Sequence, residues 1–230
     1  MANLFKQPAF YFIVCVLATI LFAVLHGQNY YGYDWAHYHY YNGYAFWNQR
    51  WSYDFRPAGF HSYLNPLFDA IKFKLSTKLP YAAAALIIAA WQGLAYGLAW
   101  LIGALILEKT QLKHWRWWLL AFTLLGLYTP AISRQISGFN NDLDNSVFML
   151  LGIFLWLKTY TKETGGNPNK LLCIAGLFIG ISVGLKLTMA PIALAWLVIT
   201  LLFKPKNISR INLLFCVAIS SGLGFLLTNG

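Results

Sequence analysis

The stretch YAAAALIIAAWQGLAYGLAWLIGALIL, residues 81–107, decides the fold class of this chain. It contains no charged side chain, and a helix needs only about 20 apolar residues to cross the hydrocarbon core of a bilayer. The segment is therefore predicted to be a membrane-spanning helix that is long enough to tilt or to project past the bilayer.

The composition of the whole chain indicates the same class. Of its 230 residues, 59% are hydrophobic and only 10% are charged, whereas a soluble domain of this length carries far more charge. The formal net charge of +10 does not indicate a nucleic-acid partner, because the basic residues lie mostly in short connections between apolar runs. We predict an all-α polytopic membrane protein whose surroundings are membrane lipids.

Seven apolar runs are predicted to span the membrane, and together they make residues 1–230 a single transmembrane domain. They cover residues 10–26, 81–107, 117–133, 145–159, 171–186, 188–203 and 212–228. No small-residue cleavage site follows the first run, which is therefore predicted to be a signal anchor. Only Leu187 separates the fifth and sixth runs, and the nearby Lys186 and Pro191 indicate a sharp turn or a broken helix.

The charge distribution predicts the orientation. With the N-terminus inside, ten of the 17 Lys and Arg residues lie in inner segments and five of the seven acidic residues lie outside. This is the bias that orients membrane proteins. We therefore expect a multi-pass protein of a bacterial cytoplasmic membrane with a cytoplasmic N-terminus. Residues 27–80 would form a long first extracytoplasmic loop.

The three cysteines lie within predicted spans. Cys15, Cys173 and Cys216 show no metal-ligand spacing and no CxxC pair, so they are expected to be small core residues.

The long outer loop is predicted to carry two helices. In LNPLFDAIKFKLSTKLP, residues 64–80, Asn65 can cap a helix and Pro66 suits its first position. The apolar residues of this stretch follow near helical spacing, with Asp69, Lys72 and Lys78 elsewhere, which predicts an amphipathic helix along the membrane surface. The apolar set is Leu67, Phe68, Ile71, Leu75 and Leu79. HYHYYNGYAFWNQ, residues 37–49, is predicted to form a second, aromatic-rich helix.

Asp34 is the leading candidate for catalysis. It follows His26 by eight residues and should lie close to the outer membrane face. A carboxylate among aromatic side chains is partly desolvated, which suits it to accept a proton. The alternative is that Asp34 caps the helix that follows. The neighbouring Tyr33, Trp35, His37 and Tyr38 can stack on a sugar ring or simply anchor the chain at the interface.

Asp142 and Asp144 belong to SRQISGFNNDLDNS, residues 133–146, on the predicted outer side. Alternating carboxylates and amides supply hard oxygen ligands, so a divalent cation such as Mg²⁺ or Mn²⁺ is one hypothesis for this run. The run lacks the glycine and the distal glutamate of an EF-hand. Helix capping by Asp144 or Asn145 is the alternative.

Three basic residues lie on the predicted outer side, against the general bias. Arg56, Arg134 and Lys186 are candidates for holding a phosphate, since Arg offers a bidentate fork and Lys a point charge. The alternative is that each of them extends its charged end to the membrane interface.

The stretch YDWAHYHYYNGYAFWNQRWSYDFRPAGFHSYLNPLFDAIKF, residues 33–73, resembles the first outer loop of GT-C glycosyltransferases, specifically bacterial members related to polyprenyl-phosphate-dependent mannosyl- and arabinosyltransferases. NNDLDN and GLKLTMAP resemble this family more loosely, and the layout of one span followed by an early loop aspartate is also similar. The resemblance implies transfer of a hexosyl or pentosyl group from a polyprenyl-phosphate sugar outside the cytoplasmic membrane.

Roles for individual residues follow from this resemblance. It implies that Asp34 is the general base on the acceptor hydroxyl and that Asp142 and Asp144 assist acceptor or metal binding. Donor-phosphate binding would fall to the basic residues and stacking to the aromatic ones. The former are Arg56, Arg134 and Lys186; the latter are Tyr33, Trp35, His37 and Tyr38.

One feature departs from the family pattern. GT-C enzymes usually continue beyond a seven-span core, whereas this sequence ends at Gly230, where the seventh predicted span reaches the outer face. The expectation is a fragment of a longer chain, a chain completed by another membrane subunit, or an incomplete enzyme. A non-catalytic scaffold or lipid-binding subunit is the second functional hypothesis. Transport fits less well, because the spans are nearly free of midplane charge and show no internal repeat.

Overall fold

The computed structural model describes residues 7–26, 32–54, 59–110, 112–161, 167–203 and 208–229, and all regular structure within these ranges is helical. The chain divides into two compact units, residues 1–147 and 148–230, which are described separately. The helices of the first unit are α1 (Pro8–His26), η2 (Trp35–His39), α2 (Tyr40–Asn48), η3 (Arg50–Ser52), η4 (Gly59–Tyr63), α3 (Leu67–Lys78), α4 (Tyr81–Leu107), α5 (Trp115–Leu125), η5 (Gly126–Tyr128), α6 (Pro130–Ser133) and the start of α7 (Asp142–Lys158). The second unit holds the rest of α7, α8 (Pro168–Leu185), η6 (Leu187–Met189), α9 (Ala190–Leu202) and α10 (Arg210–Asn229).

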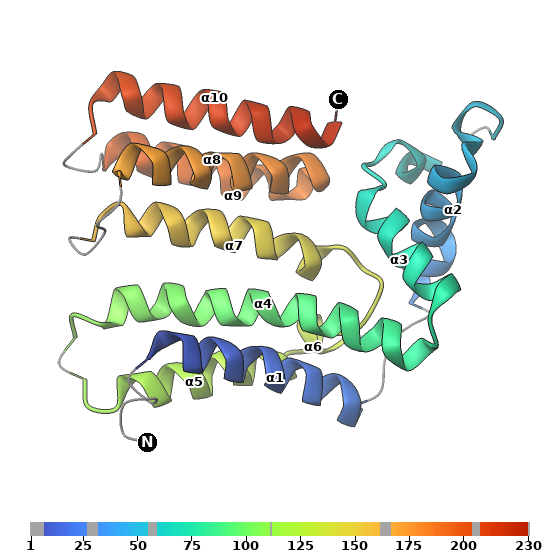
Figure 1. Cartoon of the computed structure of the whole chain (residues 1–230), viewed down its shortest axis with the longest axis horizontal. Helices are drawn as coiled ribbons and strands as arrows, with labels where there is room; N and C mark the ends of the chain where they lie inside the picture. The colour runs from blue at the N-terminus through green and yellow to red at the C-terminus, as the bar shows by residue number, and fades with distance from the viewer. Residues whose placement is uncertain are drawn as a thin grey trace. The chain divides into compact units, whose positions relative to one another are not determined.

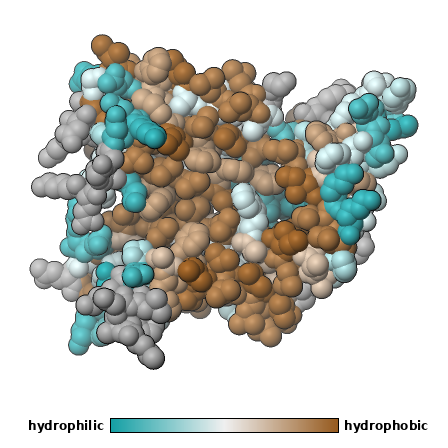
Figure 2. All heavy atoms as spheres, in the orientation of Figure 1, coloured by the Kyte–Doolittle hydropathy of each residue, from teal (hydrophilic) through white to brown (hydrophobic). Residues whose placement is uncertain are grey.

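Four of the helices are long and apolar enough to cross a membrane: α1, α4, α8 and α10. Figure 2 shows hydrophobic residues over much of the visible face of the molecule. The other three predicted spans form shorter helices, with 11 residues in α5, 17 in α7 and 13 in α9. The prediction of an all-α chain is confirmed, and four of the seven predicted spans form helices long enough to cross a membrane.

The predicted span 117–133 is interrupted for a clear reason. After α5 the chain makes the short turn η5, and Thr129 is extended at φ −67° and ψ 137°. A residue before proline is disfavoured in helical conformation, so Pro130 forces this break and then begins α6. A similar break separates α8 from α9, where Lys186 is extended at φ −151° and ψ 108°. The predicted interruption near Lys186 is thus confirmed.

Helices α1 and α4 form the core of the first unit and lie side by side (Figure 1). Tyr11 of α1 stacks on Trp100 of α4 with ring centroids 4.4 Å apart. Gly93 allows the close approach, since a Cβ there would lie 2.9 Å from the backbone of Val16. Small residues at such contacts let membrane helices pack backbone to backbone.

The segment between α1 and α4, which the sequence predicts to be the outer loop and which is called the outer segment below, folds as η2, α2, η3, η4 and α3, and α2 packs closely against α3. Both predicted helices are therefore confirmed, and the Asn65 side chain accepts a hydrogen bond from the Leu67 backbone N–H at 2.9 Å. The side of α3 that is buried is unexpected. Asp69 and Lys72 are each only 2% exposed, whereas Leu67 and Ile71 are 43% and 48% exposed. The buried side of the helix thus contains one acidic and one basic residue, together with Ala70 and Phe73.

The second unit is held together mainly by α8 and α10, which pack along one another (Figure 1). Gly180 of α8 and Gly224 of α10 have no room for a side chain, because a Cβ at either would collide with the backbone of the facing helix. Cys173 and Cys216 form a disulfide between these helices, with Cα atoms 4.5 Å apart. The expectation of three separate core cysteines is corrected: Cys15 is buried and reduced, and the other two are paired.

Candidate functional site

Asp34 lies at the entry to η2, a five-residue π-helical segment of a kind found often at functional sites. Its side chain makes no capping hydrogen bond. The carboxylate instead lies close to the hydroxyl of Tyr38, one turn further along. Burial, and then the charge of Asp34, raises the pKa of Tyr38. The helix-cap interpretation of Asp34 is therefore not supported, and the half-buried carboxylate faces Tyr38.

Tyr38 marks the point where acidic residues from three parts of the chain converge. Asp142 and Asp69 also raise the pKa of this tyrosine, after burial and Asp34. The Tyr38 ring stacks on His61 at 3.9 Å and lies 4.2 Å from the ring of His39. We call Asp34, Tyr38, His39, His61 and Asp142 the Tyr38 cluster.

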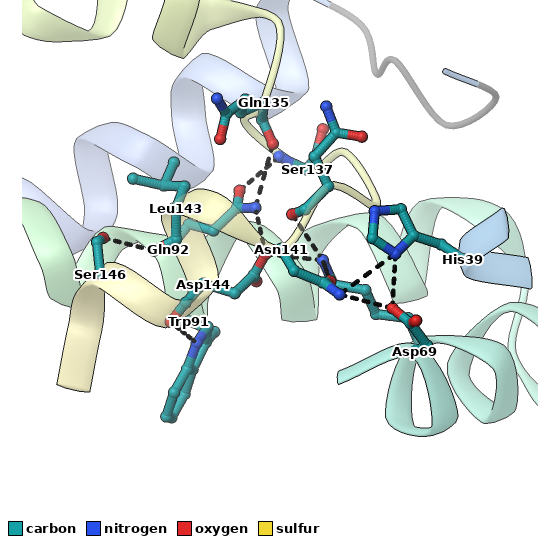
Figure 3. A network of polar contacts seen from close by, with 12 residues as sticks. His39, Asp69, Trp91, Gln92, Gln135, Ser137, Asn141, Leu143, Asp144 and Ser146 are labelled. Atoms are coloured by element: carbon teal, nitrogen blue, oxygen red, sulfur yellow. Dashed lines mark hydrogen bonds and ion pairs between the residues drawn. The ribbon is translucent and has the colours of Figure 1, made fainter. Parts of the chain in front are cut away.

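A hydrogen-bonded network lies beside this cluster, centred first on Asp69 (Figure 3). The Nδ1 of His39 donates to Asp69 Oδ1 at 2.8 Å, because a carboxylate can only accept. The amide of Asn141 donates to the same oxygen at 2.6 Å, and Asn42 donates to the other oxygen at 3.2 Å. Asp69 thereby joins η2, α2 and the segment before α7 to α3.

The second centre of the network is Lys72 of α3. Its ammonium group donates to Asp144 Oδ2 at 2.7 Å, to Asn141 Oδ1 at 3.0 Å and to the Asn140 carbonyl at 2.9 Å. Gln92 of α4 donates weakly to Asp144 at 3.4 Å and accepts from the Ser137 backbone N–H at 2.7 Å. All three donors of the lysine are thus satisfied inside the protein.

The whole set is called the buried network: His39, Asn42, Asp69, Lys72, Gln92, Asn141 and Asp144. Charged groups inside a protein must be paired and hydrogen-bonded. Burial of these groups is tolerated because Asp69 is paired with His39 and Lys72 with Asp144. The network connects η2, α2, α3 and α4 with the residues that begin α7. It fixes the position of the Tyr38 cluster, since His39 belongs to both sets.

The run NNDLDN divides between the two sets. Asp142 is half-buried and acts on Tyr38, whereas Asp144 is committed to Lys72 and Gln92. Since α7 already begins at Asp142, neither Asp144 nor Asn145 is the residue that starts the helix. Within the part of the chain that the structure describes, no group of three or more His, Cys, Asp or Glu residues is arranged to hold a metal ion.

The predicted stacking aromatics lie in different surroundings. Tyr33 is exposed and stacks on His37 at 3.6 Å. Trp35 is buried against Phe139, with ring centroids 4.2 Å apart, so it belongs to the core beneath the site. Tyr38 is half-buried in its cluster.

The predicted phosphate-binding residues belong to different parts of the chain. Arg134 is exposed and follows α6 directly. Lys186 is half-buried at the break between α8 and α9, in the second unit. Arg56 lies outside the described residues.

Sequence reasoning missed most of the buried network. Asp69 and Lys72 looked like the solvated side of an amphipathic helix, and Gln92 was passed over inside an apolar run. Gln92 did carry a signal, because an amide inside a predicted span needs a hydrogen-bond partner within the protein. It finds two such partners in Ser137 and Asp144.

Comparisons with protein-family models, with curated proteins and with solved structures found no match to this chain. The class is therefore defined by the structure itself: an all-helical protein with four long apolar helices, consistent with a multi-pass membrane protein. Its distinguishing feature is a polar cluster built on a folded segment between the first two of these helices.

Proposed function

We propose that this protein is a membrane glycosyltransferase of the GT-C type. It would move a hexosyl or pentosyl group from a polyprenyl-phosphate donor to an acceptor hydroxyl on the extracytoplasmic side. The observation that carries the proposal is the contact of Asp34 with the Tyr38 hydroxyl, in a segment that follows an apolar helix, with the charge of Asp142 near enough to act on the same tyrosine. Two acidic groups beside stacked aromatic rings form a surface suited to a sugar and its acceptor.

The chemistry assigns one role to each part of the cluster. Asp34 takes the proton of the acceptor hydroxyl as its oxygen forms a bond to the anomeric carbon of the sugar. The bond between that carbon and the phosphate oxygen breaks, and the polyprenyl phosphate leaves with the electron pair. Arg56 and Arg134 are the proposed cations for that phosphate. The stacked rings of Tyr38 and His61 provide a flat face for the sugar.

The proposed topology has seven crossings, with α5–α6, α7 and α9 as the three short ones. The N-terminus would be cytoplasmic and the segment from η2 to α3 extracytoplasmic, in a bacterial cytoplasmic membrane. The charge bias of the connecting segments supports this orientation. Completion by a further membrane subunit or by additional chain is compatible with it.

The test is turnover of radiolabelled polyprenyl-phosphate mannose and arabinose by the full chain in proteoliposomes. Asp34→Asn should lower release of polyprenyl phosphate by about 10²–10⁴-fold, the range of a general base, while the unfolding temperature stays close to that of the native chain. Asp54→Asn is the matched control, because Asp54 lies on the same segment but pairs with Arg50. Native turnover by Asp34→Asn, or no turnover of either donor by the unaltered chain, would contradict the proposal.

A non-catalytic scaffold is the second candidate. It is favoured by the buried network, in which four polar side chains of the outer segment are used internally: His39, Asn42, Asp69 and Lys72. A scaffold tolerates Asp34→Asn in every assay but loses assembly with its membrane partner when the network is broken. Co-purification of such a partner with the unaltered chain and with Asp34→Asn, but not with Lys72→Met, is the distinguishing result.

A further inference from the structure

His39 is held by only one of its two ring nitrogens. Its Nδ1 lies 2.8 Å from Asp69 Oδ1 and 3.3 Å from the amide nitrogen of Asn141. The other ring nitrogen, Nε2, makes no hydrogen bond with any residue that the structure describes. One nitrogen of the imidazole is thus used inside the protein, and the other is left for something else.

The contact with Asp69 decides which nitrogen carries the hydrogen. A carboxylate can only accept, so Nδ1 is the donor, and the neutral imidazole then has its lone pair on Nε2. Asp69 is itself held in place, because Asn141 donates to Oδ1 at 2.6 Å and Asn42 donates to Oδ2 at 3.2 Å. His39 therefore presents an acceptor nitrogen in a fixed direction, as functional histidines do when a buried carboxylate orients them.

Nε2 keeps some exposed surface. Within the described ranges it is not one of the fully buried polar atoms that lack a partner, although the His39 side chain as a whole is only 8% exposed. Figure 3 shows this nitrogen on the side of the ring that points away from Asp69. An acceptor in this position is satisfied by water or by a ligand group that donates a hydrogen bond.

The surroundings of Nε2 favour a neutral ligand with a flat apolar face. The His39 ring lies 4.2 Å from the ring of Tyr38, which stacks on His61 at 3.9 Å. Burial, and then the charges of Asp34 and Asp142, raise the pKa of Tyr38, so the negative potential here disfavours an anionic group. A sugar ring meets both conditions, because its C–H face stacks on aromatic rings and its hydroxyl groups donate hydrogen bonds.

We infer that Nε2 of His39 accepts a hydrogen bond from a hydroxyl group of the transferred sugar, whose ring lies against Tyr38. This inference rests on the proposed function, since the sugar is the one that the proposed reaction transfers. The two residues have different roles: Asp34 takes the proton of the acceptor hydroxyl, whereas His39 orients the donor sugar. His39 also contributes to specificity, because a sugar without that hydroxyl leaves the nitrogen without a partner.

Asparagine at position 39 separates the functions of the two ring nitrogens. Its amide N–H can replace Nδ1 as a donor to Asp69, but nothing replaces Nε2. His39→Asn should therefore keep the fold and lose the contact with the sugar. His26→Asn is the matched control, because His26 is exposed at the end of α1 and its Nδ1 also contacts an oxygen, the backbone carbonyl of Phe22, at 3.3 Å.

The first measurement is steady-state transfer from polyprenyl-phosphate mannose and arabinose in proteoliposomes. His39→Asn should raise KM for the donor about three- to tenfold, as loss of one hydrogen bond does. The kcat value should change little, because the contact is the same in the bound donor and in the transition state. His26→Asn should keep the KM of the unaltered chain. An unaltered KM in a folded His39→Asn variant would overturn the inference, since the bond to Asp69 would then be the whole role of His39.

The second measurement does not require turnover. Diethyl pyrocarbonate acylates the unprotonated nitrogen of imidazole, and mass spectrometry of peptides reads each histidine separately. At about pH 8, where histidine is usually neutral, His39 of the unaltered chain should be modified, and free mannose or arabinose should slow this reaction in a saturable way. Modification of His26 should not respond to the sugar. An unreactive His39, or a rate that is the same with and without sugar, would contradict the contact.

The two measurements separate this inference from the proposed function. Protection of His39 by sugar without transfer from either donor would reject the proposed reaction and keep the sugar contact. Transfer with no protection of His39 and no change in KM would reject the contact and keep the reaction. If His39→Asn does not fold, protection of His39 in the unaltered chain decides.

Discussion

The Lys72 ammonium lies 2.7 Å from the Asp144 carboxylate, and both residues are only 2% exposed. These residues are far apart in the sequence, and their contact joins α3 to the beginning of α7. A buried pair of this kind contributes little net stability compared with apolar residues, but removing one partner leaves an uncompensated charge inside the protein. The ion pair therefore favours one particular arrangement of the outer segment over alternatives that would separate Lys72 from Asp144.

Lys72→Met should lower the free energy of unfolding by about 3–5 kcal/mol, because Asp144 is left buried without its cation. The double variant Lys72→Met with Asp144→Asn should lose less than the sum of the two single variants, since they share one interaction. Denaturant unfolding in detergent measures both. Lys78→Met is the control on the same helix, where Lys78 is exposed, and its effect should stay within about 0.5 kcal/mol. If the losses of unfolding free energy in the two single variants simply add in the double variant, Lys72 and Asp144 are not coupled and this account is contradicted.

Gly43→Ala should separate α2 from α3. A Cβ at Gly43 would collide with the backbone carbonyl of Asp69 and with the Cβ of Phe73, neither of which can rotate away. Overpacking of this kind costs about 1–3 kcal/mol or more, and we expect a lower unfolding temperature together with faster proteolysis of the outer segment. Gly126→Ala serves as comparison, because its added Cβ would make only ordinary contact with Tyr96, at 3.6 Å. Equal stability of the two variants would refute this account of the α2–α3 contact.

Lowering the pH should destabilise the outer segment through protonation of Asp54. Hydrogen bonds from Arg50 and from Tyr41 lower the pKa of this carboxyl in the folded protein. A group whose folded pKa lies below its unfolded value, about 3.9 for Asp, stabilises the fold above that value and loses this contribution as the pH falls through the folded pKa. The unfolding temperature of Asp54→Asn should therefore be below that of the unaltered chain at pH 7, and the difference should shrink below about pH 4.

Arg50→Gln provides the check on this assignment. Because Arg50 is the main cause of the lowered pKa, its removal should abolish most of the acid-dependent difference attributed to Asp54. A difference that persists in the Arg50→Gln background would mean that another group carries the pH dependence.

Cysteine labelling should distinguish the disulfide from separate thiols. The denatured chain should take up one maleimide before reduction, at Cys15, and three after it, since Cys173 and Cys216 are paired. Intact-mass spectrometry reads the number directly. Uptake of three labels without reduction would show that α8 and α10 are held by packing alone, and Cys216→Ser should then leave the labelling pattern of Cys173 unchanged.

Several parts of the fold follow from local sequence. Apolar runs define α1, α4, α8 and α10, because the length of an apolar helix depends only on neighbouring residues. Local rules also place the capping contact of Asn65 at the start of α3 and the break at Lys186. The interruption before Pro130 was not predicted, because residues 117–133 have the hydropathy of a membrane span despite the proline.

Only part of the candidate site could be predicted from the local sequence. Asp34 and Asp142 were both chosen from the sequence, and the structure brings each of them near Tyr38. Asp69, His39 and Lys72 were not chosen, because their role depends on partners about 30 to 70 residues away, to which no local pattern refers. The same reason explains why Cys173 and Cys216 were not expected to pair.

The sequence by itself determined that this chain is helical and suited to a membrane, since both properties depend on the apolar character of consecutive residues. Only the tertiary structure decided which side of α3 faces inward. Its hydrophobic pattern predicted that Leu67 and Ile71 would share one side with the charges elsewhere, but not that Asp69 and Lys72 would be buried. Burial of those charges is possible only because Asn141, Asp144 and His39 arrive from other segments to satisfy them.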